Sequence, residues 1–223
     1  MWSLPGVCTL ANAPERRGNQ TWARAELRVL KMFEVEFDGP VSPEFALAMK
    51  SLHSVQVRSE LHIEQIPAPG NLAKHAIAFA AHIDDQTSAG DAGVGRIVFL
   101  WHDEPQENWV GRFRVVCFAK SPLESHIGQE DVSADLAWDW LTTALRARNA
   151  EYAAEAGTST RILSTGYGAL AHQAPHAELE MRASWSPTGA ALAPHLEAWQ
   201  DLVCIMSGFP NLPAGVTSLG LSR

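Results

Sequence analysis

The clearest pattern along the chain is a strict alternation of apolar and polar residues over AELEMRASW, residues 177–185. Its apolar positions share one side of an extended chain: Leu179, Met181, Ala183 and Trp185. Because successive side chains of a strand point to opposite faces, the segment predicts a strand with one buried and one solvated face. A less regular strand is predicted just before it, in GTSTRILSTG, residues 157–166.

Four further segments in the first half of the chain are short, rich in β-branched or aromatic residues and bounded by turn formers. They are SELHIEQI (59–66), HAIAFAAHI (75–83), RIVFLWH (96–102) and WVGRFRVVCFAK (109–120). The segments that join them are PAPGN (67–71), the loop DDQTSAGDAGVG (84–95) and the turn DEPQEN (103–108). Connections of this kind join neighbouring antiparallel strands, so we expect a meander.

Three segments have helical periodicity, with apolar residues that recur every three or four positions. In SPEFALAMKSLH, residues 42–53, Ser42 can cap the helix and Pro43 suits its first turn. A second helix is predicted over residues 134–148 and a third over residues 190–207. Each is expected to bury one apolar stripe against the sheet.

The order helix, four strands, helix, two or three strands, helix predicts an α+β fold. We expect an antiparallel sheet of about six or seven strands with three helices packed mainly on one face. We expect residues 1–40 to form a poorly ordered or weakly helical N-terminal arm. We expect residues 41–223 to form a single domain, because no long polar linker interrupts them. Met32 offers a second start of translation, in which case residues 1–31 would not be physiological.

Charge and cysteine content narrow the class of protein. The formal net charge is −8, no basic run is interleaved with aromatics, and no stretch approaches 18 consecutive apolar residues, so we expect neither nucleic acid nor a membrane as partner. Cys8, Cys117 and Cys204 are widely spaced and odd in number, which favours free thiols in a reducing compartment. The start of the chain lacks the pattern of a signal peptide, and we therefore predict a cytoplasmic protein.

Histidines are the first candidates for metal chemistry. His62, His82 and His102 recur at equal intervals, each with an acid close behind it. In a simple meander the first two can lie at one end, but about six residues of strand would place His102 on the order of 20 Å away. HQAPH, residues 172–176, contains a proline that prevents the helix on which its two histidines would share a face. We predict no metal site and no cofactor.

The run HDE, residues 102–104, allows two interpretations. His102 could act as a general base oriented by Asp103, at the edge of the sheet. Pro105 and Asn108 follow at once, however, and residues of these types are typical of a turn. We favour the turn and keep His102 and Asp103 as weak catalytic candidates.

The solvated face of the predicted sheet is the main candidate for binding. Cross-strand ion pairs are the ordinary explanation for the charged residues there. The alternative is a polar cleft for a small ligand or for a charged segment of a partner, lined by His62, Arg114, Arg182 and Trp185. Tryptophans outside the helical stripes, at positions 101, 109 and 138, would add to such a surface if they were partly exposed.

Several motifs carry a resemblance to a known family: PEFALAMKSL, IPAPGNLAKHA, GRIVFLWHDEP and ELEMRASWSP, in this order. They resemble an actinobacterial family of conserved proteins known only as domain of unknown function number three thousand, and the likeness covers about residues 40–218. The resemblance implies a bacterial cytoplasmic protein. It supplies no activity, cofactor or catalytic residue, and it leaves the chemistry open.

No strong catalytic or metal-binding motif occurs in the chain. We therefore hypothesise a non-enzymatic binding or regulatory module, whose partner is an unknown protein or a small-molecule ligand. The alternative is a small hydrolase-type enzyme that uses histidine and carboxylate groups at the sheet edge. Association with nucleic acid through a local arginine patch is a third and weaker hypothesis, given the acidic chain.

Overall fold

The computed structural model describes residues 41–84, 91–123 and 133–209, so the expected arm over residues 1–40 lies outside the described residues. Three α-helices are present in this part of the chain: α2 (Pro43–Leu52), α3 (Ser133–Ala147) and α4 (Ala193–Met206). Six strands accompany them: β1 (His62–Ile66), β2 (His75–Asp84), β3 (Asp91–Gln106), β4 (Gly111–Leu123), β5 (Tyr152–Ser164) and β6 (His176–Pro187). Two short 3₁₀ turns, Glu107–Trp109 and Gly168–Leu170, follow β3 and β5.

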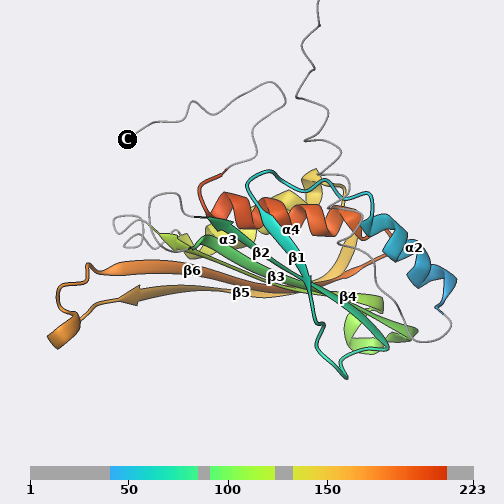
Figure 1. The fold of residues 1–223 in the computed structure, drawn as a ribbon. Coiled ribbons are helices and arrows are strands. Elements are labelled where there is room, and N and C mark those ends of the chain that lie inside the picture. Colours follow the sequence, from blue (N-terminus) through green and yellow to red (C-terminus); the bar gives the residue numbers. More distant parts are fainter. Residues whose placement is uncertain (1–40, 85–90, 124–132, 210–223) are drawn as a thin grey trace, which may run out of the picture.

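The six strands form one sheet in the order β1-β2-β3-β4-β6-β5, and all neighbours are antiparallel (Figure 1). The first four strands are the predicted meander. The last two form a long hairpin in which β6, not β5, lies beside β4. The predicted α+β class with an antiparallel sheet is thus confirmed, at six strands in the described residues.

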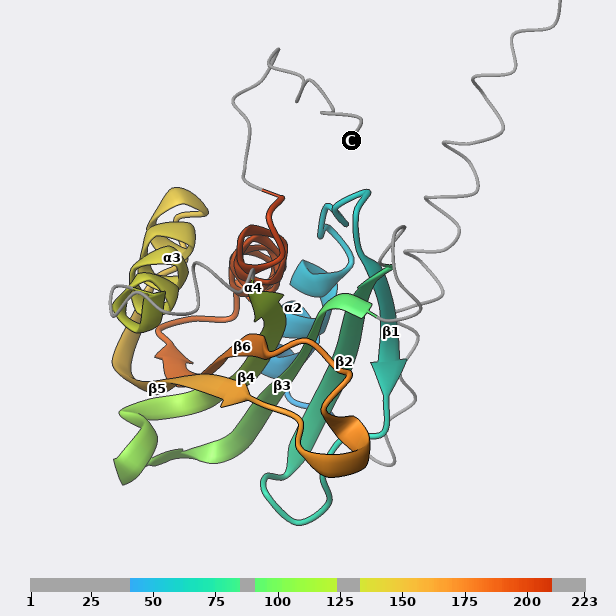
Figure 2. The ribbon, with the colours of Figure 1, turned by 90° about the vertical axis from the view of Figure 1, so that its left-hand side faces the viewer.

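Figure 2 shows α3 and α4 above one side of the sheet, and α2 contacts α4. Helix α4 lies over β3 and β4, and α3 lies over β5 and β6. The indole of Trp199 in α4 donates a hydrogen bond to the carbonyl oxygen of Phe118 in β4, at 3.2 Å. The core fills the space between these two layers, with Trp185, Trp199 and Phe79 fully buried in it.

The helix signals in the sequence correspond to real caps. The backbone N–H of Phe45 donates to the Ser42 hydroxyl at 3.1 Å, so Ser42 is the N-cap of α2, and Pro43 occupies the first turn. At the other end of the chain, α4 is followed by Gly208 in the left-handed region, at φ +83°. Within the described residues no helix is long and apolar enough to cross a membrane.

The loop predicted over residues 84–95 is wrong at its C-terminal end, because β3 already begins at Asp91. The glycines that suggested a loop serve close packing instead. A Cβ atom on Gly95 would lie 2.7 Å from side-chain atoms of Trp199 and Val203, and one on Gly93 would lie 1.9 Å from the Ser207 hydroxyl. These positions lack side chains because α4 packs directly on the backbone of β3.

The turn predicted over residues 103–108 is displaced toward its C-terminus. Strand β3 continues with irregular pairing to Gln106, and the chain reverses in the 3₁₀ turn that ends at Val110, at φ +57°. His102 is therefore not the last strand residue. Asp103 and Pro105 lie in an extended, irregular stretch between Trp101 and Gln106, where the regular register with β4 is interrupted.

Two findings concern the burial of residues singled out from the sequence. Trp101 is 1% exposed and packs against Phe45 and His75, so it is a core residue; Trp109 and Trp138 are half-buried. Helix α4 is buried on nearly all sides, where the sequence predicted a single apolar stripe. Its polar residues His195, Gln200 and Asp201 are buried as well.

Candidate functional site

The face of the sheet that points away from the helices, called the open face below, consists of alternate residues of each strand. Gly95 lies against α4 and marks the helix side of β3, so its neighbours Val94 and Arg96 lie on the open face. The strand register then assigns every other residue. Residues paired directly across neighbouring strands point to the same face and form rows that run across the sheet.

One of these rows brings two arginines to either side of an aromatic ring. Arg96 of β3 pairs with Phe118 of β4, and Phe118 pairs with Arg182 of β6. The row, called the arginine row below, continues to Ala80 on β2 and to Thr158 on β5. The guanidinium carbon of Arg182 lies 4.9 Å from the centre of the Phe118 ring, a cation–π distance.

The adjacent row of the open face is apolar. Val98, Val116 and Ala78 occupy its centre on three neighbouring strands, followed by Ser184 and Ala156. Val116 is 43% exposed, which is high for a valine in the middle of a sheet. The arginine row and this apolar row together place positive charge beside hydrophobic surface.

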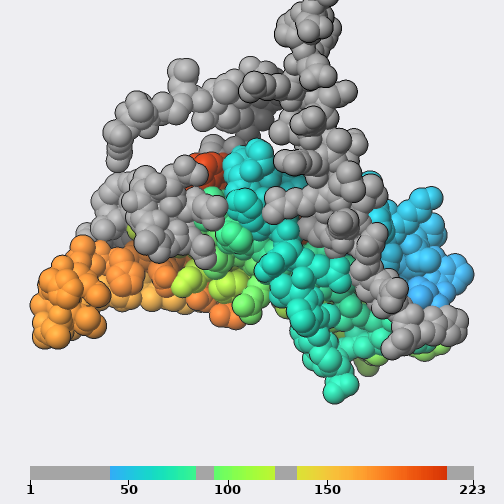
Figure 3. Space-filling model, in the orientation of Figure 1, coloured from blue at the N-terminus to red at the C-terminus, as the bar shows by residue number. Residues whose placement is uncertain are grey.

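Two grooves lie over these rows, and both are lined by Arg96, Phe118 and Arg182. The first, of about 500 Å³, extends over the apolar row to Thr158 on β5. The second, of about 680 Å³, extends toward His82 on β2. Figure 3 shows the open face edge-on, along the lower outline of the molecule between the far end of the β5–β6 hairpin and residues 67–74.

Arg114 lies on the same face, two residues before Val116. Its guanidinium donates hydrogen bonds to the carbonyl oxygen of Ala154 at 2.8 Å, to the Ser186 hydroxyl at 3.2 Å and to the Ser184 hydroxyl. Burial lowers the pKa of Arg114 from its ordinary value. Arg114 thus joins β4 across β6 to the bulge of β5 at Ala154, where φ is +53°.

The other predicted binding residues are placed apart. His62 lies at the β1 edge, where its ring stacks on His82 at a centroid distance of 5.1 Å. Trp185 lies on the opposite, helix-covered face; its indole N–H donates to Nδ1 of His195 at 3.0 Å. Burial lowers the pKa of His195 to about 4, so this histidine is a neutral acceptor in the core. Arg114 and Arg182 alone of the four share the central open face.

His102 and Asp103 each have a different partner. The His102 ring lies 5.4 Å from the Trp109 ring, and Asp103 forms an ion pair with Lys74, with both side chains about half exposed. Neither residue lines the two grooves. The arrangement therefore resembles a hairpin end held by an aromatic contact and an ion pair.

Cysteine and metal chemistry find little support in the described residues. Burial raises the pKa of Cys117 and of Cys204 to about 12, which keeps both thiols protonated and unreactive. No group of three or more histidine, cysteine, aspartate or glutamate side chains in residues 41–84, 91–123 and 133–209 could hold a metal ion.

Arg96 and Phe118, which line both grooves, were not among the site residues predicted from the sequence. Phe118 could have been found, because the alternation of FRVVCFAK places it on the face opposite Cys117. The place of Arg96 in the site could not have been found in this way. Its neighbour across the sheet depends on where β3 begins and on the register in which β3 pairs with β4.

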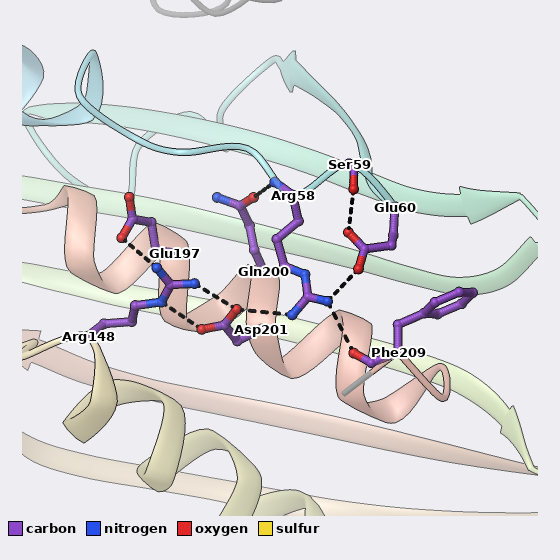
Figure 4. Close-up of polar contacts among 8 residues, drawn as sticks. All are labelled: Arg58, Ser59, Glu60, Arg148, Glu197, Gln200, Asp201 and Phe209. Carbon is purple, nitrogen blue, oxygen red and sulfur yellow. Dashed lines mark hydrogen bonds and ion pairs between the residues drawn. The ribbon is translucent and has the colours of Figure 1, made fainter. Parts of the chain in front are cut away.

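A second polar cluster lies on the helix side and is shown in Figure 4. The fully buried carboxylate of Asp201 accepts hydrogen bonds from Arg148, at 2.7 and 3.0 Å, and from Arg58, at 3.3 Å. Arg58 also pairs with Glu60 and Arg148 with Glu197. Because each charge has an opposite partner, we interpret the cluster as a structural clamp between α4 and the segments around it.

Comparisons with known proteins identify a family for this chain but supply no activity. A family model described as a protein of unknown function (DUF3000) matches residues 41–217. No curated protein and no solved structure matches this chain.

Proposed function

The chain belongs to the DUF3000 family of proteins of unknown function, and we propose that it is a non-enzymatic binding module whose open face holds a small organic anion with an apolar body. The observation that carries the proposal is the arginine row, in which Arg96 and Arg182 flank Phe118 beside an apolar row. The grooves over it, of about 500 and 680 Å³, fall in the size range of small-molecule sites.

Charge supports an anionic ligand. The chain as a whole is acidic, with a formal net charge of −8, yet three arginines gather at the centre of the open face. Glu180 neutralises only one of them, through a 3.2 Å contact with Arg182. Arg114 donates to a carbonyl and two hydroxyls, and its charge remains uncompensated by those partners. Such a local concentration of positive charge attracts anions and disfavours cations.

The apolar row supports a hydrophobic body on the ligand. Val98, Val116 and the Phe118 ring present hydrophobic surface beside the guanidinium groups. A ligand that covered them would gain roughly 25 cal/mol for each Å² of apolar surface removed from water. A purely polar anion such as phosphate would gain nothing there, so we expect selectivity for anions that carry an aliphatic or aromatic group.

The test uses 8-anilinonaphthalene-1-sulfonate, an aromatic anion whose fluorescence rises when it leaves water, titrated into the full chain. The variants Arg96→Gln and Arg182→Gln keep much of the side-chain length and remove the charge. Because a hydrogen bond to a charged group contributes about 1.5–3 kcal/mol, each variant should bind the probe roughly ten times more weakly or worse.

The matched control is Arg146→Gln, which removes an exposed arginine from the last turn of α3. It should leave the affinity unchanged. Equal affinities for the wild type and for both open-face variants would reject the site, as would an equal loss in the Arg146→Gln variant. A neutral dye, Nile red, should lose much less affinity than the sulfonate in the same variants, because its binding depends on the apolar row.

The alternative hypothesis, a small hydrolase at the sheet edge, has less support. Asp103 is ion-paired with Lys74 and His102 packs on Trp109, so no geometry favours proton transfer between the two residues. For location we propose the cytoplasm, since Cys117 and Cys204 are free and buried, as is typical of proteins in a reducing compartment.

A further inference from the structure

The chain that leads into α2 begins beside the open face. Glu44, in the first turn of α2, forms a 3.0 Å ion pair with Arg112 of β4. Arg112 and Phe118 share one face of β4, because an even number of residues separates them. Val41 lies three residues before Glu44. The segment that precedes Val41 therefore approaches the sheet at the open-face end of β4, near the turn between β3 and β4 (Figure 1).

The sequence just before Val41 has the same two-sided character as the open face. Residues 33–38, FEVEFD, lie outside the described residues and are called the acidic segment below; they alternate strictly between apolar and acidic types. In an extended chain the two types lie on opposite sides: Phe33, Val35 and Phe37 on one, Glu34, Glu36 and Asp38 on the other. The open face likewise places an apolar row beside the arginine row. Segment and face are thus complementary in both hydrophobicity and charge.

We propose that the acidic segment binds to the open face of its own chain, with its apolar side over the apolar row and its carboxylates toward Arg96 and Arg182. It then occupies the site that a small organic anion would fill, and the two compete. The competition rests on the proposed function, whereas the contact itself does not.

The length of the intervening chain fits this contact. Along β4 the apolar row lies four residues from Arg112, about 13 Å, and the arginine row lies six residues away, about 20 Å. An extended chain covers about 3.3 Å per residue, so Asp38 reaches about 10 Å from Val41 and Glu34 about 23 Å. Residues 39–40, glycine and proline, are typical turn formers and allow the chain to bend onto the sheet. The acidic segment can therefore reach both rows.

Charge on the open face favours this occupant. Arg96 is exposed and has no ion-pair partner within residues 41–84, 91–123 and 133–209. Arg182 contacts Glu180 at 3.2 Å, yet its side chain is 64% exposed. Carboxylates held by a short tether have an effective concentration of about a millimolar at such a surface. Individually weak ion pairs are then sufficient to hold the segment.

The first test traps the contact in the full chain by a disulfide. All variants carry Cys8→Ser, since the other two cysteines are buried. Val35→Cys is combined with Val116→Cys, on the exposed apolar row. Mild oxidation should link the two within one chain, which a non-reducing gel shows as a monomer of altered mobility, because a disulfide needs Cα atoms within about 7 Å.

The matched control combines Val35→Cys with Val110→Cys. Val110 is 72% exposed and lies two residues from Arg112, nearer to the start of α2 than Val116 is. A segment that is merely tethered would react with the Val110 position at least as fast, whereas the proposal predicts faster trapping at Val116. Equal rates, or faster trapping at Val110, would overturn the contact.

The charge dependence of trapping checks the role of the arginines. Arg96→Gln and Arg182→Gln, added together to the Val35–Val116 pair, should slow disulfide formation about fivefold, and about 0.5 M NaCl should have a similar effect. Arg146→Gln should leave the rate unchanged. A rate indifferent to the two arginines overturns the proposal. So does a disulfide that forms only between two chains, since the segment would then lie on another copy.

The second test measures the competition, with 8-anilinonaphthalene-1-sulfonate as the probe. The triple variant Glu34→Gln, Glu36→Gln and Asp38→Asn weakens the internal competitor, so it should bind the probe about threefold more tightly than the wild type. The control neutralises three exposed carboxylates in and just after α3, and so changes the net charge equally: Asp135→Asn, Asp139→Asn and Glu151→Gln. The control should not gain affinity, and an equal gain in both variants would refute the competition.

The two tests separate this inference from the proposed function. A probe that fails to bind the open face refutes the proposed function and the competition with it, while the trapping rates still decide the contact. A probe that binds equally well with and without the carboxylates of the acidic segment, together with no trapping at Val116, refutes this inference and leaves the proposed function standing.

Discussion

Replacement of His195 by asparagine tests whether a buried neutral histidine sets the acid stability of this protein. His195 is 1% exposed, and its Nδ1 accepts the indole N–H of Trp185 at 3.0 Å. Protonation would place a second N–H donor against that indole and a charge in the core. Burial accordingly lowers the pKa to about 4, from about 6.5 in the unfolded chain.

The direction of the pH effect follows from these two values. Between pH 6.5 and pH 4 the unfolded chain binds a proton at His195 and the folded chain does not. The stability contributed by the neutral histidine is therefore complete above pH 6.5 and is lost progressively as the pH falls toward 4. For pKa values of about 4 and 6.5, the loss from pH 8 to pH 5 amounts to about 2 kcal/mol.

The assay is urea unfolding followed by tryptophan fluorescence at pH 8 and at pH 5, with linear extrapolation to water. The asparagine side chain cannot titrate, yet its oxygen can replace Nδ1 as the acceptor for Trp185. His195→Asn should be less stable than the wild type at pH 8, but it should lose about 2 kcal/mol less between the two pH values. The same pH-dependent loss in both proteins would refute the reasoning. Glu60, whose pKa Arg58 lowers by a hydrogen bond against the opposing effect of burial, acts mainly below this window.

Two further predictions concern packing and the clamp on α4. Asp201→Asn leaves Arg58 and Arg148 without their buried carboxylate, so it should destabilise the fold by about 3 kcal/mol, a drop of about 6–12 °C in Tm by calorimetry. Glu197→Gln, which loses one 3.2 Å ion pair, should cost under about 1 kcal/mol, and similar losses in the two variants would contradict a buried clamp. Gly95→Ala should lower the free energy of unfolding by about 1–3 kcal/mol, because the new methyl group would collide with Trp199. The control Gly189→Ala, where a Cβ would meet open space, should change the stability little. An unchanged stability of Gly95→Ala would mean that α4 can move away from β3.

Local signals predicted the elements of this fold well where they depended on neighbouring residues. The alternation over residues 177–185 corresponds to β6, with Leu179 and Met181 buried as expected. The cap at Ser42 marks the start of α2. The predictions were wrong or incomplete where the structure of a segment depends on another element that packs against it. Gly95 resembles a loop residue until α4 is placed against it, and the exposure of Trp101, left open by the sequence, is decided by its contact with Phe45.

The candidate site was predictable only in part, for the same reason. Arg114 and Arg182 could be assigned to the solvated face from the period of their own strands. Their relation to Arg96 and Phe118 depends on the pairing of three strands, and no local pattern encodes that register. Trp185 was expected near the same site, but the parity of β6 places it on the helix side.

The position of α4 also has a consequence for how the chain folds during synthesis. Strands β1 to β4 are complete at Leu123, but the helix that covers β3 and β4 begins only at Ala193. At a synthesis rate of about 5–20 residues per second, the apolar side of the meander remains uncovered for roughly 4–14 s. Arg58 meets Asp201 across a sequence separation of 143 residues, so the clamp that locks α4 closes among the last contacts. The nascent chain is thus most prone to aggregation while its C-terminal third is still being made.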